Sequence, residues 1–120
     1  MTSFQHTHQE AHAMASSALS EHRDFAATYA LLEELATAGG DYGILRPARR
    51  CLSEAFTELT DSGLHTPNVI VSPPSVANAE DGFDRLEDLL ARMLGDVTGL
   101  PAVLRLTRVR ELVAKARGSG

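Results

Sequence analysis

Histidine is the residue type whose spacing in this chain could support metal chemistry. Four of the five histidines lie within the first 22 residues, and two of them, His8 and His12, are four residues apart. On a helix this spacing places both imidazoles on one face, where they could share a zinc, nickel or copper ion. Two further histidines could contribute, so the candidate metal ligands are His6, His8, His12 and His22.

These histidines depart from two well-defined metal signatures. A zinc-protease helix needs glutamate directly after its first histidine, where this chain has Gln9. A di-iron bundle needs glutamate followed three residues later by histidine, and no glutamate here has that neighbour. We therefore expect exposed polar histidines near a helix start, with metal binding across a dimer as the alternative.

His22 is a separate case because it lies on an apolar stripe between Ala18 and Phe25. We expect a core or interface histidine whose ring is hydrogen-bonded, and the alternative is a pH-sensitive switch. Cys51 is the only thiol, and we interpret it as a small packed side chain because the arginines before it face other directions on a helix. No serine or glycine pattern indicates a catalytic site or a phosphate loop, so we expect neither catalytic residues nor a cofactor.

Four amphipathic patterns must position these residues. Apolar side chains recur at spacings of three and four, which predicts helices over residues 8–38, 45–62, 79–95 and 99–117. The first would be unusually long, about 45 Å at 1.5 Å per residue. Asn78 is a good cap for the third helix, and Pro47 is tolerated in the first turn of the second.

Each predicted helix has one stripe that needs a partner. The expected core consists of Phe25, Tyr29, Leu32 and Ala36; Leu45, Ala48, Leu52, Ala55 and Leu59; Phe83, Leu86, Leu90, Met93 and Val97; and Ala102, Leu106, Val109 and Val113. Stripes of this kind are buried against one another in helical bundles. The sequence therefore predicts one all-α domain over residues 1–120, resembling a four-helix bundle with a long N-terminal helix and a long crossover loop.

That crossover loop, residues 64–78, is longer than most connections and carries Val69, Ile70 and Val71 at its centre. We expect these side chains to pack on the helices while the loop's three prolines stiffen an extended path. The alternative is a partner-binding edge that adds as a strand to another chain.

Charges are distributed unevenly over the last two predicted helices. The third is acidic at its start and the fourth is basic toward its end, through Glu80, Asp81, Asp84, Glu87 and Asp88 and through Arg105, Arg108, Arg110, Lys115 and Arg117. In an antiparallel pair these regions lie side by side and suit the helix dipoles. The basic residues therefore indicate pairing of helices rather than contact with phosphate.

Composition limits where the protein works. No apolar run is long enough to span a bilayer, and the first residues lack the charge and apolar stretch of a signal peptide, so we expect a cytoplasmic protein without membrane contact. A net charge of -5 disfavours broad nucleic-acid binding. Ten of the eleven basic residues are arginine, which is typical of GC-rich bacterial coding sequence.

Together these patterns favour a non-enzymatic protein that binds another protein and forms a homodimer. The small side chains of the long first helix could meet a second chain closely, because shorter helices would leave its N-terminal half uncovered. The candidate partner-binding residues are Ala11, Ala15, Ala18, His22, Val69, Ile70 and Val71. The alternatives are a small-molecule or metal sensor that uses the histidine-rich helix, and a regulator that binds or mimics DNA.

Overall fold

The computed structural model describes residues 19–119, and this part of the chain is mostly α-helical and has no β-strand. Its long helices are α2 (Phe25–Ala38), α3 (Arg46–Thr60), α4 (Ala79–Asp96) and α5 (Leu100–Ser119). The short 3-10 helix η1 (Gly39–Tyr42) joins α2 to α3. Across residues 19–119, no helix has the length and apolar character needed to cross a bilayer.

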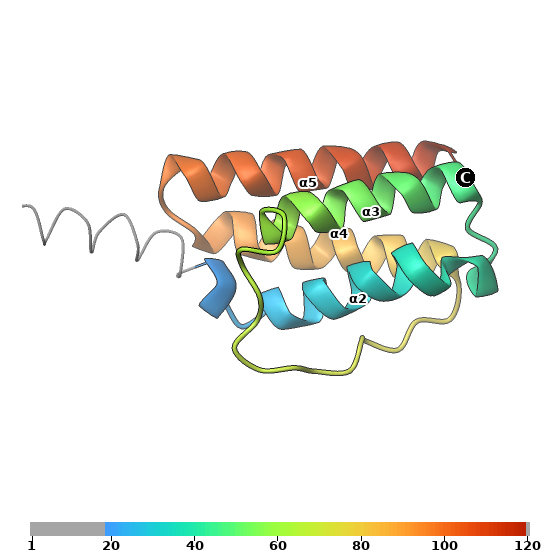
Figure 1. Ribbon diagram of the computed structural model, residues 1–120, viewed down its shortest axis with the longest axis horizontal. Helices are drawn as coiled ribbons and strands as arrows, with labels where there is room; N and C mark the ends of the chain where they lie inside the picture. The colour runs from blue at the N-terminus through green and yellow to red at the C-terminus, as the bar shows by residue number, and fades with distance from the viewer. Residues whose placement is uncertain (1–18, 120) are drawn as a thin grey trace, which may run out of the picture.

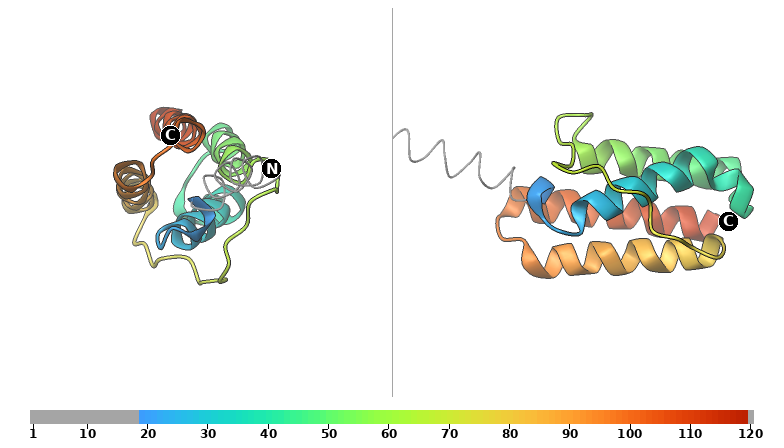
Figure 2. Two further views of the ribbon diagram at one scale, coloured as in Figure 1. Left: turned by 90° about the vertical axis from the view of Figure 1, so that its left-hand side faces the viewer. Right: turned by 90° about the horizontal axis from the view of Figure 1, so that it is seen from below.

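These four long helices lie side by side in a ring, and each packs against two others (Figure 1). The contacts join α2 with α3, α3 with α5, α5 with α4 and α4 with α2. Neighbouring helices run antiparallel, as the colour gradients in Figures 1 and 2 show. The two diagonal pairs, α2 with α5 and α3 with α4, therefore each run in one direction.

The hydrophobic core lies along the inside of this ring and confirms most of the predicted stripes. Buried members are Ala48, Leu52, Ala55 and Leu59 of α3; Phe83, Leu86, Leu90 and Met93 of α4; and Ala102, Leu106, Val109 and Val113 of α5. Val97, just beyond α4, is only partly buried. The prediction for Leu45 was wrong, because this residue precedes α3 in an extended conformation and its side chain is exposed.

The core face of α2 is rotated relative to the prediction. Tyr29 and Ala36 are only partly buried, whereas Thr28, Leu31 and Leu35 are fully buried beside the predicted Leu32. The predicted stripe assumes one continuous helix that includes the residues before Phe25. Because the helix is broken at that point, the residues that face the core in α2 differ from those of a continuous helix. The partly buried Tyr29 ring packs instead against Phe56 of α3, with ring centroids 4.8 Å apart.

The predicted unbroken helix over residues 8–38 is interrupted at residues 22–24. Residues 19–21 are helical, but the amide of Phe25 donates to the carbonyl of His22, three residues back, and α2 begins only there. The His22 ring contributes to the interruption because its Nδ1 accepts the Asp24 amide at 3.1 Å. A local side-chain bond of this kind competes with the helical pattern.

The ends of the helices follow their sequence signals closely. Asn78 caps α4 by accepting the Asp81 amide at 2.8 Å, and the Asp81 carboxylate in turn accepts the Ala77 amide at 2.9 Å. Pro47 lies in the first turn of α3, where its missing N–H has no helical partner to lose. Between α2 and α3 the left-handed residue is Gly43, with φ 82°, where a side chain would be strained.

After α3, the chain turns and returns along the molecule to the start of α4. We call residues 66–76 of this connection the strap; it runs outside α2 and bows away from the helices (Figures 1 and 2). The expectation that its central side chains pack on the helices was wrong, since Val69 and Ile70 are 65% and 94% exposed. Val76 is the strap residue that packs on the core.

Leu90 offers a direct test of the core. Replacing this fully buried leucine, Leu90→Ala, removes apolar contacts and leaves a cavity, so the free energy of unfolding should fall by about 2–5 kcal/mol. The matched control is Leu104→Ala on α5, whose leucine is 58% exposed and should change stability by less than about 0.5 kcal/mol. Urea unfolding of both variants measures the difference; similar losses would contradict this core.

Candidate functional site

The strap and the outer face of α2 enclose two adjoining cavities, which we call the strap groove. One cavity, of about 130 Å³, is lined by Ala26, Tyr29, Ala30, Glu33, Glu34, Pro67, Ile70, Val71 and Pro73. The other, of about 200 Å³, is lined by Ser20, Glu21, His22, Arg23, Ala26, Pro67, Asn68, Val69 and Val71. Because Ala26, Pro67 and Val71 line both cavities, the groove follows the strap over much of its length.

The strap presents apolar side chains and carries no charge of its own, while the charges that line the groove, such as Glu33 and Glu34, belong to α2. Residues 66–79 contain no ionisable side chain, although charged residues make up 22% of the chain. Ile70 is almost fully exposed, while Val71 is 39% exposed and lines both parts of the groove. Three adjacent β-branched residues on an outer segment form an apolar surface of the kind that often marks an interaction site.

The main chain of the strap is also unpaired. Considering all contacts among residues 19–119, none of residues 66–76 takes part in a hydrogen bond. The last bond before the strap joins the amide of His65 to the carbonyl of Thr60, and the next donor after it is Ala77. The strap therefore offers both backbone donors and acceptors to another chain.

His22 closes one end of the groove through a contact with α4. Its Nε2 lies 2.8 Å from Oδ2 of Asp96, and its Nδ1 accepts the amide of Asp24. An Nδ1 that accepts cannot carry a proton, so the hydrogen lies on Nε2, which donates to the carboxylate. The expectation that the ring has a hydrogen-bonded partner is confirmed, with Asp96 as the partner.

Asp24 lies beside this contact and is nearly buried. Its Oδ2 has no hydrogen-bond partner, and its closest cationic atoms are Arg92 Nη1, 3.9 Å from Oδ1, and Arg23 Nε, 4.0 Å from Oδ2. Arg92 directs its shorter contact, 2.7 Å, to Asp88 on its own helix. The contacts of Asp24 with Arg23 and Arg92 are therefore long ion pairs beside the turn at residues 22–24, without a short hydrogen bond between them.

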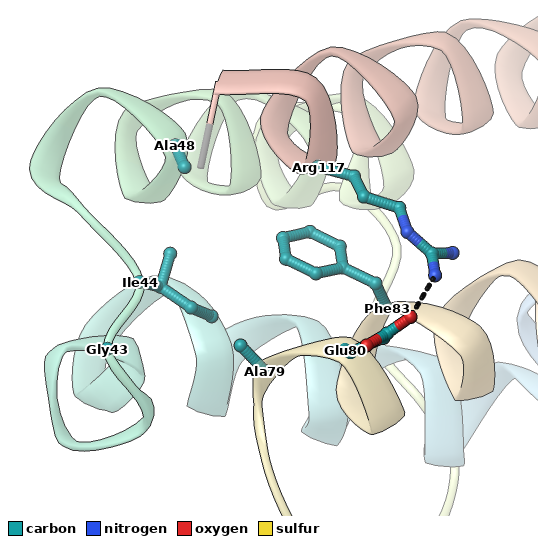
Figure 3. A pocket seen from close by; sticks show the side chains of 7 residues that line it. All are labelled: Gly43, Ile44, Ala48, Ala79, Glu80, Phe83 and Arg117. Atoms are coloured by element: carbon teal, nitrogen blue, oxygen red, sulfur yellow. Dashed lines mark ion pairs between the residues drawn. The ribbon is translucent and has the colours of Figure 1, made fainter.

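A separate pocket lies at the opposite end of the helices, where the turn between η1 and α3 meets α3, α4 and α5 (Figure 3). It measures about 320 Å³ and is lined by Gly43, Ile44, Ala48, Ala79, Glu80, Phe83 and Arg117. Figure 3 shows Ile44 and the Phe83 ring pointing toward its interior, with Arg117 and Glu80 paired at one side. The pocket thus combines an apolar floor with one ion pair.

Arg117 confirms that the acidic start of α4 and the basic end of α5 lie side by side. Its guanidinium is 2.8 Å from Asp84, 3.0 Å from Glu87 and 3.7 Å from Glu80. The hydrogen bond from Arg117 to Asp84, supported by Glu87, raises the pKa of the guanidinium above its ordinary value. Arg105 pairs elsewhere, with Asp61 at the end of α3.

Several sequence candidates are not covered by the part of the chain that the structure describes. His6, His8, His12, Ala11, Ala15 and Ala18 lie outside the described residues. Among residues 19–119, no group of three or more histidine, cysteine, aspartate or glutamate side chains could hold a metal ion. Cys51 is partly buried against the core.

The sequence analysis did not identify two features of these sites, namely the role of Asp96 and the end pocket. Asp96 is 74 residues from His22, and neither residue carries a local signal that would pair them. The end pocket is lined by residues of four parts of the chain. The sequence indicated only one of its sides, where the basic end of α5 with Arg117 lies beside the acidic start of α4. Comparison with models of known protein families, with curated proteins and with solved structures finds no match for this chain.

The His22 contact generates a prediction about local opening. In Asp96→Ala the imidazole loses its acceptor, so the amides of residues 19–24 should exchange with solvent faster, and unfolding should cost about 0.5–1.5 kcal/mol less. Asp88→Ala is the control, because it removes an exposed carboxylate from the same helix whose pair is worth about 0.3–0.5 kcal/mol. Equal exchange at residues 19–24 in the two variants would contradict the restraint.

Proposed function

We propose that this is a non-enzymatic protein that acts by binding other protein chains, copies of itself included, through the strap. The observation that supports the proposal is the coincidence of exposed β-branched side chains and an unpaired main chain in one uncharged segment. Native proteins usually protect such edges with charges or cover them. A segment left unprotected is suited to strand addition or docking by a partner.

In this proposal the helices serve as a scaffold. We propose that α2 to α5 constitute a four-helix bundle that holds both ends of the strap, through His65 at one end and Ala77 at the other. Holding the ends limits the conformations of the strap and so lowers the entropy lost when a partner orders it. Cytoplasmic location and homodimer formation are parts of the same proposal.

The first part of the chain is proposed as an additional contact surface. Ala11, Ala15 and Ala18 are small and share the spacing of one helix face, which would permit close approach of a second chain. His22 follows these residues in the sequence and lines the strap groove. We retain these residues with Val69, Ile70 and Val71 as the proposed partner-binding set.

A second candidate function is binding of a small molecule in the end pocket. Its volume of about 320 Å³ falls at the lower end of the range of about 300–1,000 Å³ usual for such sites. An apolar floor beside one ion pair would suit a compact ligand with an apolar body and a polar group. A shift of the Phe83 ring resonances on titration with a fragment library would support this alternative.

Photo-crosslinking tests the protein-binding proposal. With a benzophenone amino acid in place of Ile70, exposure to light in cells of the source organism should produce discrete adducts, because the side chain would lie at the interface. The same group in place of Leu104, an exposed apolar residue of α5, controls for nonspecific capture. Adducts identical in kind and yield at both positions would contradict binding through the strap.

A further inference from the structure

We propose that the strap pairs with the strap of a second copy of this chain, forming a short antiparallel β-ribbon centred on Ile70. This inference rests on the proposed protein-binding function and specifies the partner and the register. Pairing of this kind uses the backbone groups of the strap, which have no hydrogen bond within residues 19–119.

The prolines of the strap favour this register. In an antiparallel pair centred on Ile70, Pro67 lies opposite Pro73 of the second copy. Opposed residues alternate between hydrogen-bonded and non-hydrogen-bonded pairs. If the two Ile70 residues form a hydrogen-bonded pair, both prolines fall at non-hydrogen-bonded positions, where their missing N–H removes no bond of the ribbon.

This register leaves five residues, Asn68 to Ser72, free to pair between the prolines. The donors are the amides of Asn68, Ile70 and Ser72 on each chain, which gives up to about six bonds across the two-fold axis. Side chains also match, because Val69 of one copy lies opposite Val71 of the other. Cross-strand pairs of β-branched residues stabilise sheets.

Charge favours a second copy as the occupant. The whole chain carries a formal charge of -5, so two copies repel one another over most of their surfaces. Residues 66–79 carry no ionisable side chain, so two straps can pair without like-charge repulsion between their own residues, and the acidic groove residues Glu33 and Glu34 belong to α2. A two-fold symmetric contact brings the same surface of both copies together, and an uncharged segment meets its copy without repulsion.

The outer side of the strap is accessible. Figures 1 and 2 show the strap as the outermost segment beside α2, with no other described element outside it. Ile70, at the proposed two-fold axis, is 94% exposed. A ribbon of five residues buries less area than a standard interface, so we expect a reversible dimer with a Kd on the order of 0.1 mM.

Sedimentation equilibrium from about 10 µM to about 1 mM tests the association. The wild-type chain should pass from monomer toward dimer, and Ile70→Lys should weaken association at least about tenfold, because it places two ammonium groups opposite each other. Ser75→Lys adds the same charge to an exposed strap residue outside the paired stretch and should associate like the wild type. Since both residues are exposed, both variants should keep the wild-type circular dichroism spectrum.

Amide exchange at about 1 mM tests the register itself. The amides of Asn68, Ile70 and Ser72 should be protected relative to a dilute sample, whereas those of Val69 and Val71 should not. Equal protection of all five amides, or dimerisation unaffected by Ile70→Lys, would overturn the pairing while leaving self-association through another surface. A wild-type chain that stays monomeric would also overturn it, yet crosslinks from position 70 to a different protein would still uphold the proposed function.

Discussion

The shared direction of α3 and α4 is the constraint on which the rest of the structure depends. Because α3 ends at one end of the ring and α4 starts at the other, the chain must travel the length of the helices between them. A helix of 15 residues is about 22 Å long, and extended chain advances about 3.3 Å per residue. Spanning that length takes at least about seven extended residues, a minimum that residues 66–76 exceed. The connection lies outside because the inside of the ring is filled by the core.

Closure of the ring also explains where polar contacts are found. Two of the pairs that join distant parts of the chain, His22 with Asp96 and Arg117 with the carboxylates of α4, lie at opposite ends of the molecule. Between them the interior is mostly apolar, with Thr28 as a buried polar residue, and burial of the stripes supplies most of the stability. The polar contacts mainly position the ends, namely the turn before α2 and the walls of the end pocket.

Much of the fold within residues 19–119 could be predicted from the sequence, because periodicity and capping are local signals. The stripes of α4 and α5 and the Asn78 cap follow directly from them. The break at residues 22–24 could not, because the pattern around His22 reads as continuous helix and its partner on α4 is distant in sequence. Leu45 shows the same limit, since an apolar residue at a helix end fits the stripe whether or not the helix includes it.

The strap could be predicted only in part. Its length and its apolar centre were visible in the sequence, but apolar residues are normally buried, and that rule gave the wrong position for Val69 and Ile70. The exposure of these side chains follows from the path of the chain around α2, which only the assembled helices determine. The end pocket likewise requires the relative placement of four elements.

The strap also has a consequence for how this sequence can vary. The entropy lost in closing a flexible connection grows only with the logarithm of its length, about 0.6 kcal/mol for each doubling. Because residues 66–76 make no hydrogen bond within residues 19–119, and Val76 is the strap residue that packs on the core, insertions ahead of Val76 would disturb the helices little. Related chains could therefore carry longer or differently composed straps on the same helices, and partner choice could diverge while the core stays the same.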